Sequence, residues 1–168
     1  MALEVINNEI DIVTFEQDYK GRMTSSELQI FESMTKPRQW FYLTNAYKAE
    51  NKALELYPGT QLNTKADAFR HAYFHAMNTI NLGRSLSTQL GDAHEDMQGS
   101  EPLEVQMDLF NNEVGRTIAE KARASGNDYD LANLVRTALY NGELKYLSPL
   151  DLNGTIIPNI TKLIRTNQ

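Results

Sequence analysis

The chain has 168 residues, 41% of them hydrophobic and 23% charged, with no cysteine and a formal net charge of −6. This size and composition fit one soluble globular domain, because two separate cores would each bury too little apolar surface. The absence of cysteine excludes disulfides, thiolate metal ligands and a thiol nucleophile. No apolar run reaches the roughly 18–20 residues that span a bilayer, and the first residues, MALEVINNEI, lack a signal-peptide pattern. We therefore expect a soluble protein made in the cytoplasm, delivered by a specialised secretion system if it is exported.

The spacing of apolar residues predicts a mostly α-helical fold, a single domain of about five to six helices with a small C-terminal β-hairpin. Residues 1–22 contain scattered β-branched and aromatic side chains and are predicted to form an arm or a pair of strands. Residues 23–168 are predicted to form the helical domain, with a functional site on 63–116. A capping box at Thr24–Glu27 predicts the start of the first helix.

A long amphipathic helix is predicted over 37–56. Pro37 is tolerated in a first helical turn, and the Pro-Gly pair after the helix ends it. Trp40, Leu43 and Tyr47 share one side at helical spacing, so the Trp and the Tyr are predicted to be core residues.

Four more helices are predicted, separated by glycines and polar residues, over 64–81, 84–98, 101–124 and 128–140. Gly142 is placed as the C-terminal cap of the last one. Residues 144–147 are predicted to form a short strand, and the Asn-Gly pair within 152–157 indicates a two-residue hairpin turn. The tail is predicted to be extended and to pack through Ile160, Leu163 and Ile164.

The helix 64–81 carries two of the three histidines on a polar stripe. Asp67, His71, His75 and Asn78 lie at i, i+4, i+8 and i+11, opposite an apolar half, and Arg70 borders the stripe. A solvated helix face does not need so many short, titratable side chains with directional hydrogen bonds. A functional face is favoured over a polar network that only holds helices together.

The two following helices add further polar groups. Asp92, His94 and Glu95 lie on 84–98, with His94 at the edge of the apolar face. On 101–124, one ridge at i, i+3, i+4 and i+7 consists of Asp108, Asn111, Asn112 and Gly115. Asparagine and glycine in mid-helix cost roughly 0.5–1 kcal/mol each relative to alanine. We therefore expect a buried hydrogen-bond network, or the close approach of another backbone or a ligand.

Together, three helices offer imidazoles, carboxylates and carboxamides. Such a set can hold a divalent metal ion, or it can act without metal through a histidine base and an arginine that stabilises an oxyanion. The predicted metal ligands are His71, His75, His94, Glu95 and Asp108. Mixed nitrogen and oxygen ligation favours Zn or Mn, whereas an all-oxygen set from Asp92, Glu95, Asp108 and Asn111 favours Mg or Ca. The spacing matches no established metal signature, since HExxH is absent.

Three motifs, KADAFRHAYFHA (65–76), GDAHED (91–96) and MDLFNNEVGR (107–116), carry a family resemblance. They resemble the RHA, DAHE and DLxNNxxGR motifs of an uncharacterised bacterial domain family, and the likeness covers about 37–168. Members of that family often look like C-terminal modules of secreted or polymorphic toxin proteins. The resemblance therefore implies an effector-like domain, with a cognate immunity protein or a secretion carrier as partner. The matching positions are Asp67, Arg70, His71, Asp92, His94, Glu95, Asp108, Asn111, Asn112, Gly115 and Arg116, whereas His75 falls at a more variable position.

The first functional hypothesis is an antibacterial effector hydrolase, metal-dependent or not. Its predicted catalytic residues are His71, His94, Glu95, Arg70, Asp67, Asp92, Asn111, Asn112 and Arg116. The acidic chain favours a cell-envelope target, either a peptidoglycan component or a lipid-linked phosphate ester, over nucleic acid. If His71 or His94 acts as base or ligand with an ordinary imidazole pKa, activity should fall as the pH drops from about 6.5 towards 5.

Two other hypotheses stay open. The alternative is a non-catalytic interaction or adaptor domain, whose polar groups only fix the packing of three helices. The third is a metal-dependent nuclease, which would need a basic groove that the charge count does not favour. The oligomeric state is left open.

Overall fold

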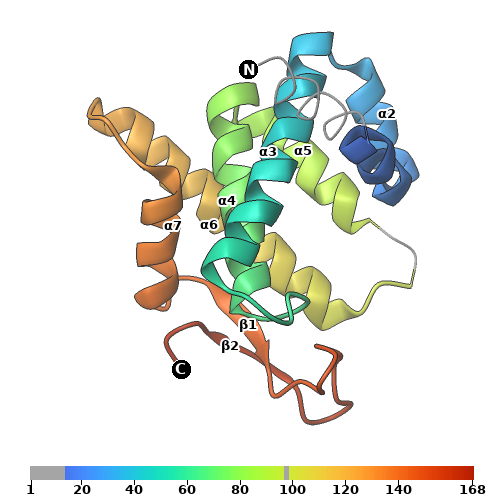
Figure 1. Ribbon diagram of the computed structural model, residues 1–168, viewed down its shortest axis with the longest axis vertical. Helices are drawn as coiled ribbons and strands as arrows, with labels where there is room; N and C mark the ends of the chain where they lie inside the picture. Colours follow the sequence, from blue (N-terminus) through green and yellow to red (C-terminus); the bar gives the residue numbers. More distant parts are fainter. Residues whose placement is uncertain (1–13, 97–98) are drawn as a thin grey trace, which may run out of the picture.

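The structure is a computed structural model that describes residues 14–96 and 99–168 (Figure 1). After helical residues 14–22 come α2 (Ser25–Ser33), α3 (Lys36–Leu56), α4 (Lys65–Leu82), α5 (Arg84–Glu95), α6 (Pro102–Ser125) and α7 (Leu131–Tyr140). Strands β1 (Lys145–Ser148) and β2 (Lys162–Arg165) form a small antiparallel sheet at the C-terminal end. The predicted mostly α-helical fold with a small C-terminal β-structure is confirmed. Within the described residues, no helix is both long and apolar enough to cross a membrane.

Several helix ends lie where local chemistry predicts them. The Thr24 side chain accepts a hydrogen bond from the Glu27 backbone N–H at the start of α2. Thr64 and Asp130 cap α4 and α7 in the same way. Gly142 follows α7 with a φ of 74°, a left-handed conformation that suits glycine. The end of α5 was predicted three residues too late, because the helix ends at Glu95.

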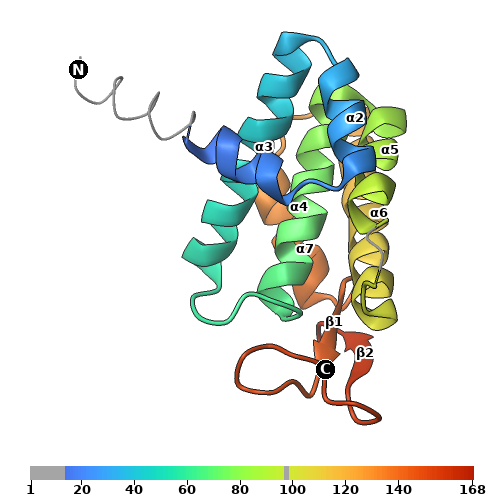
Figure 2. The ribbon, with the colours of Figure 1, turned by 90° about the vertical axis from the view of Figure 1, so that its right-hand side faces the viewer.

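Helix α4 is the central helix of the fold (Figures 1 and 2). It packs against α3 and α6, and also contacts α5 and α7. Its apolar side chains, including Phe69 and Ala72, lie fully buried in the main core. Its polar stripe is buried as well, since Asp67 and His71 are 2% and 7% exposed. The groups predicted on this stripe therefore lie inside the helix bundle and depend on partners there.

A second core joins the N-terminal helical residues to α2, α3 and α5. Phe15 and Tyr19 stack with ring centroids 5.6 Å apart, one helical turn from each other, and Tyr19 also packs edge-on against Tyr42. Residues 14–22 are helical, so the pair of strands predicted for the segment 1–22 is wrong over this part of it. The remaining residues of that segment, with Val5, Ile10, Ile12 and Val13, lie outside the described residues.

The buried face of α3 differs from the predicted one. Trp40 and Tyr47 are 52% and 40% exposed, so their placement in the core was wrong. Leu43 of the predicted side is buried, and the helix buries Tyr42, Ala46, Ala49 and Ala53 with it. Small residues let α3 lie close to α4, which leaves the bulky aromatic side chains at the edge of the contact.

The C-terminal strands pair differently from the predicted hairpin. The partner of β1 is the tail strand β2, in the register Lys145↔Arg165. The Asn153-Gly154 pair does lie in a tight turn, in which the Gly154 N–H donates to the Asp151 carbonyl, but that turn lies within the connection. Ile160 is 53% exposed, so its predicted packing was wrong, whereas Leu163 and Ile164 are partly buried.

Candidate functional site

Two carboxylates and one imidazole meet between α4 and α6. Asp67 and His71 lie one turn apart on α4, and Asp108 comes from α6. One ligand-type atom of each lies within 4.8 Å of the other two. His71 Nε2 is 3.6 Å from Asp67 Oδ1 and 3.4 Å from Asp108 Oδ1. Ligands of one tetrahedral ion, with bonds of about 2.0–2.1 Å, lie roughly 3.3 Å apart, so the three atoms can hold one metal ion.

Asn112 fixes the orientation of the His71 ring. The Oδ1 atom of Asn112 lies 3.1 Å from His71 Nδ1. A carboxamide oxygen only accepts hydrogen bonds, so this partner assigns the proton to Nδ1 and leaves the Nε2 lone pair available. Metal-binding histidines are commonly oriented by such a second partner. Burial, together with the charge of Arg70, lowers the pKa of His71 to about 3, so the ring is neutral at physiological pH.

Arg70 places a positive charge beside this cluster. Its Nε donates to Asp67 Oδ1 at 3.1 Å, Nη2 donates to the same oxygen, and Nη2 lies 3.2 Å from His71 Nε2. Burial alone would raise the pKa of Asp67, but the charge and hydrogen bonds of Arg70 lower it below its usual value. The Asp67 Oδ2 atom accepts the Asn63 backbone N–H at 2.7 Å. The His71 lone pair serves one partner at a time, so a bound ion and the Arg70 contact exclude each other.

Asp108 and Glu95 are carboxyl groups without a matching cation. Asp108 Oδ1 and Glu95 Oε1 are buried, and neither accepts a hydrogen bond from the part of the chain that the structure describes. Burial, with the charges of Asp67 and Glu95, raises the pKa of Asp108 well above its usual value. Burial likewise raises the pKa of Glu95 to about 7. Fully ionised, Asp67, Glu95 and Asp108 carry three negative charges against one on Arg70, which leaves the two charges that a divalent cation neutralises.

His94 lies on the last turn of α5 and is held by a buried glutamate. Its Nδ1 is 2.7 Å from Glu27 Oε2, and the Tyr42 hydroxyl donates to Glu27 Oε1 at 2.6 Å. Burial alone would lower the pKa of His94, but the hydrogen bond and charge of Glu27 outweigh it and raise the pKa. His94 was predicted to be a metal ligand; the structure pairs its Nδ1 with Glu27 and does not place it in the Asp67–His71–Asp108 group. Sequence reasoning missed Glu27 because its position in the capping box explained it as a helix-start residue.

His75 belongs to a separate buried cluster behind the site. Its Nδ1 lies 3.1 Å from Ser87 Oγ, and an added Cβ on Gly91 would lie 2.6 Å from its Cε1. Arg116 is 3% exposed and donates from Nε to Glu113 at 3.0 Å, and its buried Nη1 has no hydrogen-bond partner within 14–96 and 99–168. His75 is not part of the Asp67–His71–Asp108 group.

His75 makes the stability of the metal-free protein sensitive to acid. Burial, and then the charge of Arg116, lowers the pKa of His75 well below 6.5. Below pH 6.5 the unfolded chain therefore binds a proton that the folded chain does not, and stability falls by about 1.4 kcal/mol per pH unit. Between pH 7 and pH 5, the loss in unfolding free energy is expected to be about 2 kcal/mol smaller in His75→Gln than in wild type. Urea unfolding in a chelator measures both losses, and equal losses would contradict a neutral His75.

Three further predicted residues have other positions. Asn111 pairs with the backbone of Lys145, donating from Nδ2 at 2.9 Å and accepting at Oδ1 at 3.0 Å, so it attaches β1 to α6. Asp92 lies on the exposed side of α5. Gly115 lies against the backbone of α4, where an added Cβ would be 2.0 Å from the Ala72 carbonyl oxygen. This is the close backbone approach expected for the glycine of that ridge.

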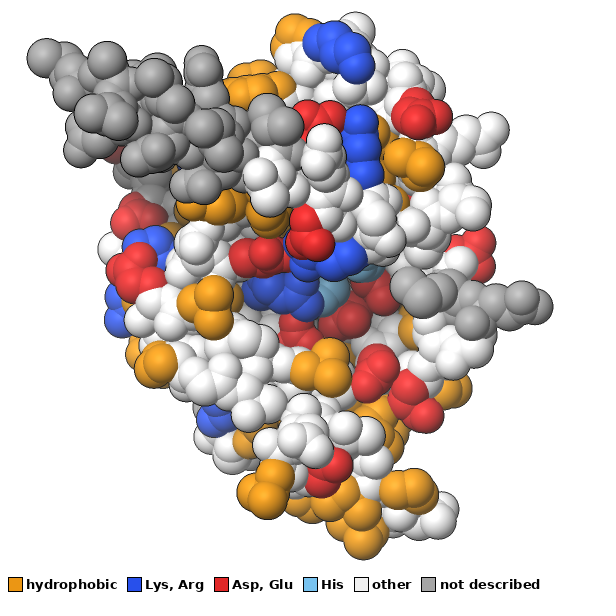
Figure 3. Space-filling view, turned by 45° about the vertical axis from the view of Figure 1, so that its right-hand side comes forward, with side chains coloured by type: hydrophobic (Ala, Val, Ile, Leu, Met, Phe, Trp, Pro, Cys, Tyr) orange, Lys and Arg blue, Asp and Glu red, His pale blue; other side chains and the backbone are white. Residues whose placement is uncertain are grey.

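Besides a hollow of about 290 Å³ at Asp67, Arg22 and Arg70, two hollows open beside the cluster. The first, of about 150 Å³, is lined by Tyr19, Arg22, Tyr42, Ala46, Ala49, Glu50, Arg70, His71, Phe74, His75 and His94. The second, of about 430 Å³, is mostly acidic, with Glu95, Glu101, Glu104 and Asp108 in its wall, and shares His94. Figure 3 shows basic and acidic side chains gathered around a histidine in one depression of the surface. The cluster therefore lies between a hollow rich in basic groups and an acidic one.

The fold and the site define a helical protein with a buried Asp-His-Asp cluster next to a cavity lined by arginines. The chain belongs to the family described as domain of unknown function (DUF6973), whose model matches residues 33–143. This confirms the resemblance to an uncharacterised domain family. Neither the curated proteins nor the solved structures include a match to the chain. The matched region contains the whole cluster, whereas Tyr19, Arg22 and Glu27 come from residues before it.

Proposed function

We propose that this chain is a metal-dependent hydrolase whose divalent ion is held by Asp67, His71 and Asp108. The observation that carries the proposal is the buried, unpartnered oxygen of Asp108 beside two other ligand atoms. Buried carboxylates are normally hydrogen-bonded or paired with a cation, and a metal ion supplies that cation here. One imidazole and two carboxylates favour Zn or Mn over Mg or Ca. When bound by these three residues, such an ion would supply an activated water, with its pKa lowered to about 7.

The neighbouring residues fit the proton transfers that hydrolysis requires. Glu95 has a pKa of about 7 and lines the same hollow as Asp108, so it accepts the proton of an attacking water. His94, held at Nδ1 by Glu27, donates a proton from Nε2 to the leaving group. Arg70 stabilises the negative charge that develops on the substrate. Asn112 keeps the His71 lone pair directed at the cluster.

The proposed target is a component of the bacterial cell envelope, as expected for a toxin-like effector. The acidic wall formed by Glu101 and Glu104, with a net charge of −6, disfavours a polyanionic nucleic acid. The toxin-like context comes from the motif resemblance. On the same ground, the proposed partner is an immunity protein or a secretion carrier.

Expression in a bacterial host tests this function. The chain is produced in the cytoplasm or, separately, with an added export signal, each alongside His71→Ala and the exposed control Asp92→Ala. We expect growth arrest only after export, lost in His71→Ala and kept in Asp92→Ala, because only His71 belongs to the cluster. Arrest only in the cytoplasm would contradict an envelope target and favour a nuclease. No arrest in either place, with folded protein present, would contradict the hydrolase and favour an interaction domain.

A further inference from the structure

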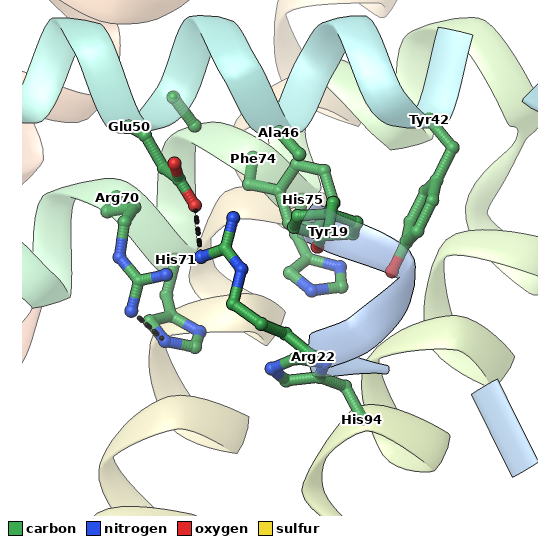
Figure 4. A pocket seen from close by; sticks show the side chains of 11 residues that line it. Tyr19, Arg22, Tyr42, Ala46, Glu50, Arg70, His71, Phe74, His75 and His94 are labelled. Carbon is green, nitrogen blue, oxygen red and sulfur yellow. Dashed lines mark hydrogen bonds and ion pairs between the residues drawn. The ribbon is translucent and has the colours of Figure 1, made fainter. Parts of the chain in front are cut away.

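We propose that the smaller hollow binds a phosphate group through Arg22, Arg70 and His94, so that the substrate is a phosphate ester. This inference rests on the proposed hydrolase, since it names the substrate class of the same site. The three side chains come from residues 14–22, α4 and α5, and they line one cavity of about 150 Å³ (Figure 4). That volume holds a few water-sized groups, enough for a phosphoryl head but not for a polymer strand.

The charges of this cavity favour an anion. Arg22, Arg70 and His94 line it, and Glu50 is the acidic residue among its lining residues. The carboxylates that pair with Arg70 and His94 lie behind them, because Asp67 and Glu27 are 2% and 0% exposed. Arg70 and His94 are therefore held by partners that stay out of the cavity, as suits phosphate recognition, whereas Glu50, the partner of Arg22, lines the cavity beside it.

Each of the three cations keeps a donor for a ligand. The bonds from Arg70 to Asp67 use Nε and Nη2, which leaves the two N–H groups of Nη1. His94 uses Nδ1 for Glu27, which leaves Nε2, a second donor when the ring is protonated. Arg22 contacts Glu50 through Nη1 at 2.9 Å and Asp18 through Nη2 at 3.4 Å, which leaves further N–H groups of its guanidinium. Figure 4 shows Arg22 extending into the cavity between Arg70 and the Tyr19–Tyr42 side.

Arg22 is the residue that we assign to specificity. It lies outside the matched family region, whereas Arg70, His94 and the metal-ligating cluster lie inside it. Its guanidinium lies over the Tyr19 ring, 5.0 Å from the ring centre, so the N-terminal helix presents it on a packed aromatic surface. The family core thus supplies the cluster and two cations, and the preceding helix adds the third.

Calorimetric titration of the metal-free protein with inorganic phosphate tests the subsite. We expect saturable binding that is at least tenfold weaker in Arg22→Gln. The matched control is Arg84→Gln, since Arg84 also contacts two carboxylates, Glu113 and Glu120, and is similarly exposed, at 38% against 45%. Wild-type affinity in Arg22→Gln, equal weakening in both variants, or no binding to wild type would overturn the inference.

A second arm identifies the source of the phosphate. Glycerol phosphate in solution is compared with vesicles of phosphatidylcholine that contain or lack phosphatidic acid. Binding to either phosphomonoester, weakened in Arg22→Gln, supports the subsite and shows whether a free ester or a lipid head group occupies it. These measurements use neither metal nor turnover, so they can succeed when the hydrolase proposal fails. Conversely, hydrolysis of a substrate without phosphate, with no phosphate binding, overturns this inference alone.

Discussion

Replacing Asp108 with asparagine is expected to abolish metal binding without destabilising the metal-free protein. The substitution keeps the shape of the side chain and removes its charge. In the metal-free protein, Asp108 is a buried carboxyl whose Oδ1 has no hydrogen-bond partner in the described segments, so losing the charge costs nothing or raises stability. In the metal-bound protein the same change removes one of three ligands. We expect hydrolysis to fall at least about 100-fold, because losing even a partner of a ligand costs 10–100-fold.

Thermal unfolding with and without Zn or Mn measures both halves of this prediction. At a free metal concentration 100 times the dissociation constant, binding stabilises the wild type by about 2.7 kcal/mol. Asp108→Asn should lose this shift, and the exposed control Asp92→Asn should keep it. A metal-free Asp108→Asn protein that is several kcal/mol less stable than wild type would assign Asp108 a structural role. A metal-induced shift that persists in the variant would remove Asp108 from the ligand set.

Helical spacing alone was enough to bring part of this site together. Asp67 and His71 are separated by one turn, as are Asp108 and Asn112, so each pair had to share one side of its helix. The mid-helix asparagines and glycine further indicated that their ridge faces another helix. These signals are local and periodic, and the contact between α4 and α6 joins the two pairs.

The remaining parts of the site have no local signal. Glu27 meets His94 across 67 positions of the chain, and Arg22 meets Glu50 across 28. Such contacts depend on how the N-terminal helices dock, which no periodicity in the chain encodes. Asn111 has the residue type and spacing of a site residue, yet it binds the backbone of β1. A side-chain amide uses the same two atoms to hydrogen-bond a strand backbone or a ligand, so the sequence alone could not separate these roles.

The expected fall of activity with pH assumed an ordinary imidazole pKa, which His71 does not have. An imidazole of ordinary pKa titrates near 6.5, but burial and Arg70 lower the pKa of His71 to about 3. His71 therefore stays neutral across the range in which its titration was expected to reduce activity. Near neutrality Glu95 titrates instead, because burial raises its pKa to about 7, while the hydrogen bond and charge of Glu27 raise the pKa of His94.

Substituting Gly115 with alanine is expected to produce the largest loss of stability from a single methyl group. The added Cβ would lie 2.0 Å from the Ala72 carbonyl oxygen and 2.9 Å from its Cα, both backbone atoms of the central helix. A flexible side chain could rotate away, but here α4 and α6 must separate. Overpacking of this kind costs about 3 kcal/mol, at the upper end of the usual range. The matched control is Gly21→Ala, because Gly21 is helical with nothing within 4 Å of an added Cβ.

Gly21→Ala should stabilise the protein by about 0.5–1 kcal/mol through helix propensity. Gly115→Ala gains the same propensity, but its larger steric penalty should leave the protein less stable than wild type. Urea unfolding of both variants separates packing from propensity. Gly115 follows Asn112 by one turn, and Ala72 follows His71 directly, so helix separation also lengthens the 3.1 Å contact between Asn112 and His71. Metal affinity should therefore fall in Gly115→Ala and stay unchanged in Gly21→Ala. Wild-type stability in Gly115→Ala would contradict the close contact of α4 and α6, and with it the distance that brings Asp108 to His71.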